Sequence, residues 1–204
     1  DGRDFTAHYY GEAGSKDKNE LSAESEAVRI KEDCFGKKFV CTEIKKGNRT
    51  KSPAPPFITS TLQQEASKKL NFQSQRTMRV AQELYEGVNL GHENGGVQGL
   101  ITYMRTDSLR VAAEAQSAAL EYIAENYGRD YCPEKPRVYR TKASAQDAHE
   151  AIRPSKVALD PEKIKKMLTP DQYKLYKLIW RRFLASQMSS AVLSTVNAEF
   201  VCES

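Results

Sequence analysis

The sequence has no stretch that could cross a membrane and no cysteine pair that could hold zinc. Its apolar runs fall far short of the roughly 20 residues that a bilayer requires. The four cysteines are scattered, and no two of them form a C-x-x-C pair. Scattered cysteines in a chain rich in Lys and Glu are typical of free thiols in a reducing cytoplasm. These absences argue against a membrane protein and a zinc-binding module, and we expect a soluble cytoplasmic protein.

The N-terminus also lacks an initiator methionine and a signal-peptide pattern. The sequence therefore predicts a piece excised from a longer protein. Its 204 residues suffice for one large or two small domains. Residues 57–187 carry 20 Lys and Arg against 15 Asp and Glu, whereas the rest carries 11 against 12. A local basic excess suits a phosphate backbone, although one this small is more often only a solvated surface.

A glycine-rich stretch, Gly87 to Gly99, is present, but no phosphate-binding loop is. Its five glycines match neither a Walker pattern nor a dinucleotide-binding fingerprint. We expect a mobile surface loop there.

The first 56 residues predict a strand, a helix and a second strand, followed by a linker. Residues Phe5–Tyr10 and Phe39–Ile44 alternate with a period of two, which is typical of strands. Between them, Ser22 can cap a helix that Gly36 ends. The segment Lys45–Pro56 closes with three prolines in four positions, so we expect a domain boundary there.

From Phe57 the pattern becomes helical. Helix starts are marked by capping residues or by a proline in the first turn. The predicted starts are Ser60 (with Gln63 completing a capping box), Ser74, Ser108, Ser144, Pro161 and Pro170. The first two helices, joined by a short polar turn, resemble a helix-turn-helix. From Val192 to Cys202 the period of two returns and predicts a strand.

We therefore expect an α+β multidomain fold. A mainly helical, helix-turn-helix-like domain, residues 57–187, would be inserted into a mainly β domain. That β domain would combine residues 1–56 with a return strand in 188–204.

A tyrosine and an arginine lie two residues apart in the segment Gly99–Ser108. Arg105 can grip a phosphate, and a helix beginning at Ser108 would offer its N-terminus to the same anion. Tyr103 would then be held beside a bound phosphodiester. Tyrosine has a reference pKa of about 10. Lowering that pKa to 7 takes roughly 4 kcal/mol of phenolate stabilisation from nearby cations or a base. The alternative is a half-buried strand tyrosine beside a surface salt bridge.

A second polar cluster follows at Asp147–Ser155. His149 and Arg153 are four residues apart and would share one face of a helix that Pro154 ends. In such a pair, Arg153 would bind a phosphate and His149 would be the titratable group.

Three blocks of this sequence together resemble the signature blocks of type IA DNA topoisomerases. They are residues 56–64 (PFITSTLQQ), 99–108 (GLITYMRTDS) and 148–155 (AHEAIRPS), in the order that the family has. The wording around the tyrosine is similar to the bacterial topoisomerase I branch, because the topoisomerase III branch usually has a proline just after it.

The resemblance implies roles for individual residues. Tyr103 matches the nucleophile that forms a 5′-phosphotyrosyl bond and frees a 3′-hydroxyl, while Arg105 and His149 match its catalytic partners. Supporting roles are implied for Asp107, Glu150 and Arg153. The implied DNA contacts are Arg105, Ser108, His149, Arg153, Thr59, Ser60 and Gln63.

The resemblance also implies a biological setting. The enzyme would relax negatively supercoiled DNA without ATP by cutting and religating one strand, as a monomer in the bacterial nucleoid. Its partners would be single-stranded DNA, supercoiled duplex DNA and the remaining domains of the same polypeptide. The helical domain would be the gate and the β elements the arch. Magnesium would bind the family's Toprim domain, which is absent here together with the clamp domain, so no metal site is expected in this chain and the fragment alone should not relax DNA.

A second hypothesis is that the protein binds DNA without cleaving it. The helix-turn-helix-like pair could belong to a module that only holds DNA, in which case Tyr103 would not be a nucleophile.

Overall fold

The computed structural model describes residues 4–15, 17–139 and 149–203, and it has an α+β fold. The chain divides into two compact units. One consists of the residues up to Arg49 together with those from Leu193 on, and the other is Thr50–Val192. Each unit is described by itself below.

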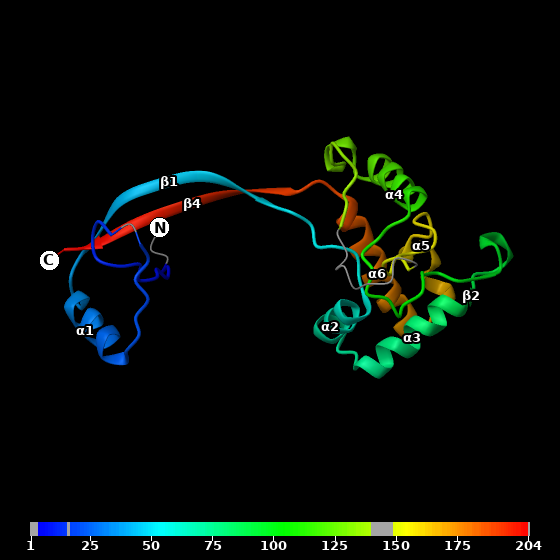
Figure 1. Cartoon of the computed structure of the whole chain (residues 1–204), viewed down its shortest axis with the longest axis horizontal. Coiled ribbons are helices and arrows are strands. Elements are labelled where there is room, and N and C mark those ends of the chain that lie inside the picture. Colours follow the sequence, from blue (N-terminus) through cyan, green and yellow to red (C-terminus); the bar gives the residue numbers. More distant parts are fainter. Residues whose placement is uncertain (1–3, 16, 140–148, 204) are drawn as a thin grey trace. The chain divides into compact units, whose positions relative to one another are not determined.

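The first unit contains α1 (Glu24–Cys34) and a ribbon of two long strands, β1 (Phe39–Lys51) and β4 (Ala191–Cys202), which pair with each other (Figure 1). The two strands run antiparallel. The N–H of Glu203 donates to the carbonyl of Lys38, and the hydroxyl of Thr42 donates to the carbonyl of Glu199. The strand predicted at the C-terminal end is confirmed.

Two predictions for this unit are wrong. The predicted linker from Lys45 is strand as far as Lys51, because β4 offers a backbone partner over that length. Residues Phe5–Tyr10 form no strand. Alternation marks a possible strand face, but a strand also needs a ladder of backbone hydrogen bonds to a neighbouring strand, which sequence alternation alone does not supply. The helix ending before Gly36 is confirmed, with Gly36 at φ 73°.

The second unit is built around one long helix. Its elements are α2 (Thr59–Leu70), α3 (Ser74–Glu86), β2 (Val88–Asn89), the 3₁₀ turn η1 (His92–Asn94), β3 (Val97–Gln98), α4 (Ala113–Asn126), η2 (Arg129–Tyr131), α5 (Pro161–Ile164), η3 (Lys165–Met167) and α6 (Pro170–Gln187). Helix α6 contacts α2, α3, α4 and α5 (Figure 1). It starts as predicted, because Thr169 Oγ1 accepts from the backbone N–H of Gln172 ahead of Pro170.

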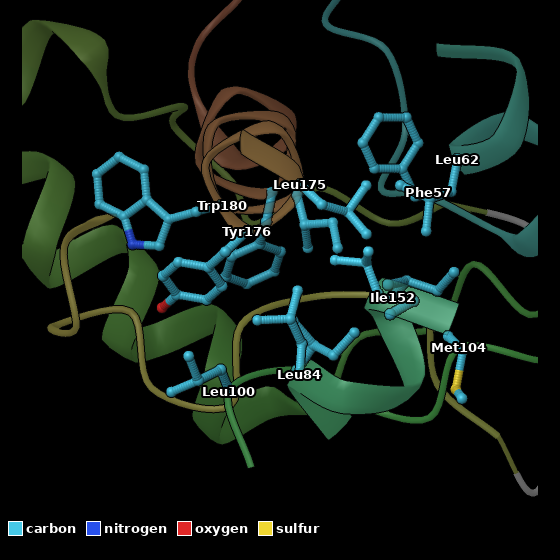
Figure 2. Close-up of a cluster of buried hydrophobic side chains, with 14 of the residues drawn as sticks. Phe57, Leu62, Leu84, Leu100, Met104, Ile152, Leu175, Tyr176 and Trp180 are labelled. Atoms are coloured by element: carbon cyan, nitrogen blue, oxygen red, sulfur yellow. The ribbon is translucent and has the colours of Figure 1, made fainter. Parts of the chain in front are cut away.

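The core forms where α6 meets the other helices and two extended segments. Figure 2 shows Leu175, Tyr176 and Trp180 of α6 with Leu84 of α3 and Ile152. A polar atom that is buried in this core needs a hydrogen-bond partner. The Tyr176 hydroxyl donates to the carbonyl of Leu159 at 2.7 Å, and burial raises the pKa of Tyr176 well above the usual value for tyrosine.

Trp180 should be one of the largest single contributors to this core. It is 5% exposed, its indole N–H donates to the carbonyl of Val157 at 2.9 Å, and its ring packs edge-on against Tyr122. We expect Trp180→Ala to lower the free energy of unfolding by about 3–5 kcal/mol. Urea unfolding of the chain measures this, with the exposed Lys174→Ala in the same helix as the control. A loss below about 1 kcal/mol would contradict the assignment.

Two local predictions in this unit are also wrong, and a third falls largely outside the described residues. Helix α4 begins at Ala113, not at Ser108, because the Ser108 hydroxyl accepts the N–H of Arg110 within a segment that stays extended. Helix α2 is capped by Thr61, whose hydroxyl oxygen accepts the N–H of Ile58, instead of by Ser60 and Gln63. The prediction of a helix from Ser144 falls largely on residues outside the described ones.

The glycine-rich stretch is a β-hairpin and not the expected loop. β2 and β3 pair antiparallel, and η1 lies at the turn. Gly91, Gly95 and Gly96 have φ values of 78°, 89° and 74°, which side chains with a Cβ rarely adopt. These glycines allow the chain to reverse between α3 and the segment that carries Tyr103.

Candidate active site

The three sequence blocks meet in space. The N–H of Ile152 donates to the carbonyl of Phe57 at 2.8 Å, and the N–H of Thr102 donates to the carbonyl of Arg153 at 3.0 Å. The Thr102 hydroxyl adds a bond to the carbonyl of Ala151 at 2.7 Å. The third block therefore lies between the first and the second, held by backbone hydrogen bonds to both.

This arrangement corrects the prediction that His149 and Arg153 share a helical face. The described residues from His149 to Pro154 are extended, because their backbone groups bond to the neighbouring segments instead of to each other. Arg153 is engaged elsewhere: its guanidinium pairs with Glu150 at 2.7 Å and donates to the carbonyl of Pro154.

Side chains alternate along residues 103–108. The exposed side chains are Tyr103, Arg105 and Asp107, and the buried ones are Met104, Thr106 and Ser108. The segment therefore presents the tyrosine, the arginine and the aspartate on one face.

Thr59, the first residue of α2, fixes the backbone of this segment. Its N–H donates to the carbonyl of Thr106 at 2.9 Å. Its hydroxyl lies 2.8 Å from the carbonyl of Met104 and accepts the N–H of Thr106 at 2.9 Å. Because these bonds lie on both sides of Arg105, they hold that residue against the N-terminus of α2.

A cavity of about 420 Å³ opens at this point. It is lined by Ile58, Thr59, Ser60, Arg105, Thr106, Asp107 and His149. Backbone N–H groups in the first turn of a helix have no partner within the helix, and the helix dipole makes this end positive. The helix N-terminus that the sequence placed at Ser108 is thus supplied by α2, and together with Arg105 it suits a phosphate.

Tyr103 lies beside this cavity between two aromatic rings. Its ring centroid is 5.7 Å from that of His149, which lines the cavity, and 5.4 Å from that of Tyr85, which meets it edge-on. Tyr103 remains 38% exposed. The ring is therefore positioned by packing while the side chain stays accessible to a ligand.

The structure does not bring every predicted site residue to the cavity. Ser108 is 1% exposed, and Gln63, Glu150 and Arg153 are not among the lining residues. Tyr85 was missed, because the helical period put it on the inward stripe of α3, whereas it is 41% exposed. A tyrosine at the end of that stripe, just before Gly87, was the only signal available.

Among the described residues, no three His, Cys, Asp or Glu side chains come together as ligands. The same residues contain no helix long and apolar enough to span a membrane.

The role of the Thr59 hydrogen bonds in holding Arg105 can be tested directly. In the DNA-cleaving enzyme that the sequence resemblance implies, we expect Thr59→Val to slow cleavage about tenfold or more, because a misplaced catalytic group is costly. It should also cost about 1–2 kcal/mol of stability through unpaired backbone groups. Thr59→Ser keeps the hydroxyl and should restore most of the cleavage rate, measured on a labelled oligonucleotide. Equal cleavage rates for Thr59→Val and Thr59→Ser would refute this role of the Thr59 hydroxyl.

An exposed tyrosine beside a cavity lined by an arginine, a histidine and a helix N-terminus agrees with the class of protein that the three sequence blocks resemble, and comparison with known proteins identifies the family. The family model described as DNA topoisomerase matches residues 4–204. The chain belongs to this family, in its bacterial type IA group, as the three sequence blocks predicted.

A solved structure gives the nearer likeness. The chain is similar to full-length topoisomerase I from Thermotoga maritima, with 41% identity and a TM-score of 0.70. The match covers 91% of this chain and 28% of that one. The chain therefore spans less than a third of the length of this relative.

Proposed function

We propose that this chain is the strand-cleaving segment of a type IA topoisomerase and that Tyr103 is its nucleophile. The observation that carries the proposal is the position of Tyr103, exposed and held by His149 at the edge of a cavity that Arg105 and the N-terminus of α2 make suitable for phosphate.

The chemistry is a transesterification. The Tyr103 hydroxyl loses its proton, its oxygen forms a bond to phosphorus, and the bond from phosphorus to the 3′ oxygen breaks. This leaves a 5′-phosphotyrosyl link and a 3′-hydroxyl that carries the proton. Arg105 and the α2 N-terminus stabilise the charge on the phosphate, while His149 orients the attacking ring. Because one ester replaces another, religation needs no ATP.

The wider architecture follows the same proposal. Residues 57–187 would be the gate domain, inserted between arch segments 1–56 and 188–204, and β1 pairing with β4 is consistent with such an insertion. The clamp and Toprim domains, with the magnesium that assists the reaction, would lie in other parts of the polypeptide. The whole enzyme would act as a monomer on single-stranded and negatively supercoiled DNA in the bacterial nucleoid.

A covalent-capture experiment tests the proposal against a pure DNA-binding module. The complete enzyme is incubated with end-labelled single-stranded DNA and magnesium and is then denatured. We expect protein-linked DNA that survives denaturation. Binding without any such adduct would favour the helix-turn-helix module instead.

The 204-residue chain alone should not relax a supercoiled plasmid, even with magnesium. Strand passage needs a ring that opens and closes, and the matched segment is 28% of the relative's length. Agarose-gel relaxation assays at equal molar amounts of chain and complete enzyme measure this. Clear relaxation by the chain would contradict the division of labour.

A further inference from the structure

A basic groove lies on the second unit, apart from the Tyr103 cavity. It has a volume of about 510 Å³ and is formed by α6 and the C-terminal end of α2. Its lining residues are Lys69, Leu70, Tyr173, Lys174, Lys177, Leu178, Arg181, Arg182 and Ala185. Five of these nine carry a positive charge and none is acidic. The groove shares no lining residue with the cavity at Tyr103.

Neighbouring carboxylates neutralise only part of this charge. Glu65 pairs with Lys69 at 2.7 Å and with Arg182 at 3.3 Å, and Glu162 pairs with Lys177.

These three cations are therefore engaged within the protein. Lys174 and Arg181 form no ion pair with another described residue, and both are exposed on α6.

The groove offers no free surface for stacking a base. Its one aromatic lining residue, Tyr173, has Lys165 over its ring at 5.0 Å and Lys177 at 5.2 Å. Proteins that bind single strands combine a basic groove with aromatic rings on which bases stack. A groove with cations and an occupied ring suits the sugar–phosphate backbone of a duplex instead.

The spacing of the two unpaired cations also suits a duplex. Seven residues of α-helix separate Lys174 from Arg181, which is about 10 Å along the axis. A duplex carries about one negative charge per 1.7 Å, so this distance spans roughly six phosphates. Two cations on one face can contact about two of them.

We propose that this groove is a second DNA site, which binds the backbone of duplex DNA without reading its sequence. The inference goes beyond the proposed cleavage site and uses no part of it. The groove suits a polyanion, and we assign DNA to it because the chain belongs to a DNA topoisomerase family.

The test is a fluorescence anisotropy titration of the 204-residue chain with a labelled 20-base-pair duplex at several salt concentrations. The variant is Lys174→Glu with Arg181→Glu. The matched control is Arg129→Glu with Lys135→Glu, which makes the same change of charge at two exposed residues outside the groove. We expect the groove variant to bind the duplex about tenfold or more weakly, and its salt slope to fall by about 2. The control should stay close to the wild type.

Equal losses in the groove and control variants would overturn the proposal, as would a wild-type chain that does not bind the duplex. An equally large loss of single-strand binding would overturn the assignment to duplex DNA. If the charge reversals unfold the chain, Lys174→Gln with Arg181→Gln makes the same comparison. Failure of the Tyr103 chemistry would leave these results unchanged, because the assay involves no cleavage.

Discussion

Replacing Tyr103 with Phe in the complete enzyme will abolish the covalent protein–DNA adduct. Only the hydroxyl can attack phosphorus, and Phe lacks it. The ring that packs against Tyr85 and His149 is retained. Among the described residues the Tyr103 hydroxyl has no hydrogen-bond partner, so the folded state should lose little. Adduct formation on a labelled oligonucleotide measures the effect, and thermal melts and non-covalent DNA binding should remain close to the wild type.

Tyr85→Phe is the matched control. Tyr85 is exposed to a similar degree and touches Tyr103, but only Tyr103 also packs against His149, which lines the cavity. We expect this variant to retain cleavage. Wild-type cleavage by Tyr103→Phe, or its loss in Tyr85→Phe alone, would end the assignment of the nucleophile.

Arg105→Ala and His149→Ala should each slow cleavage by about 10²–10³-fold without abolishing it. Both residues line the cavity that we propose binds phosphate, and removing one group that stabilises transition-state charge typically has an effect of this size. Because the two share one cavity, the double variant should lose much less than the sum of the two single losses in free energy.

The control for this pair is Arg110→Ala, an exposed arginine on the same segment that does not line the cavity. It should cleave at close to the wild-type rate in a single-turnover assay. Full additivity of Arg105→Ala and His149→Ala would contradict a shared phosphate site.

The local pattern around Tyr103 could be predicted from the sequence, because exposed and buried side chains alternate there and residues two apart lie on the same side. Tyr103 and Arg105 accordingly share an exposed face. His149 reaches the cavity as well, but by a different route from the one predicted. The segment after it is extended because its backbone bonds to Phe57 and Thr102, and such distant partners leave no periodic signal.

Other features depended on contacts far apart in the chain. The Thr59 hydroxyl serves backbone groups 45 and 47 residues away, which no local motif indicates. β1 continues to Lys51 because β4 lies beside it, although its basic sequence resembles a linker. The basic groove needs α2 and α6 together, and overall charge only hinted at it.

The most direct test of the central claim is to locate the DNA on the protein. The covalent adduct of the complete enzyme is digested with trypsin and a nuclease, and the modified peptide is fragmented in a mass spectrometer. No Lys or Arg lies between residues 80 and 104, so one tryptic peptide, residues 80–105, contains both Tyr85 and Tyr103. We predict a phosphate-linked nucleotide on Tyr103, joined through its 5′ end. A nucleotide on Tyr85, on another residue, or joined through its 3′ end would contradict the account.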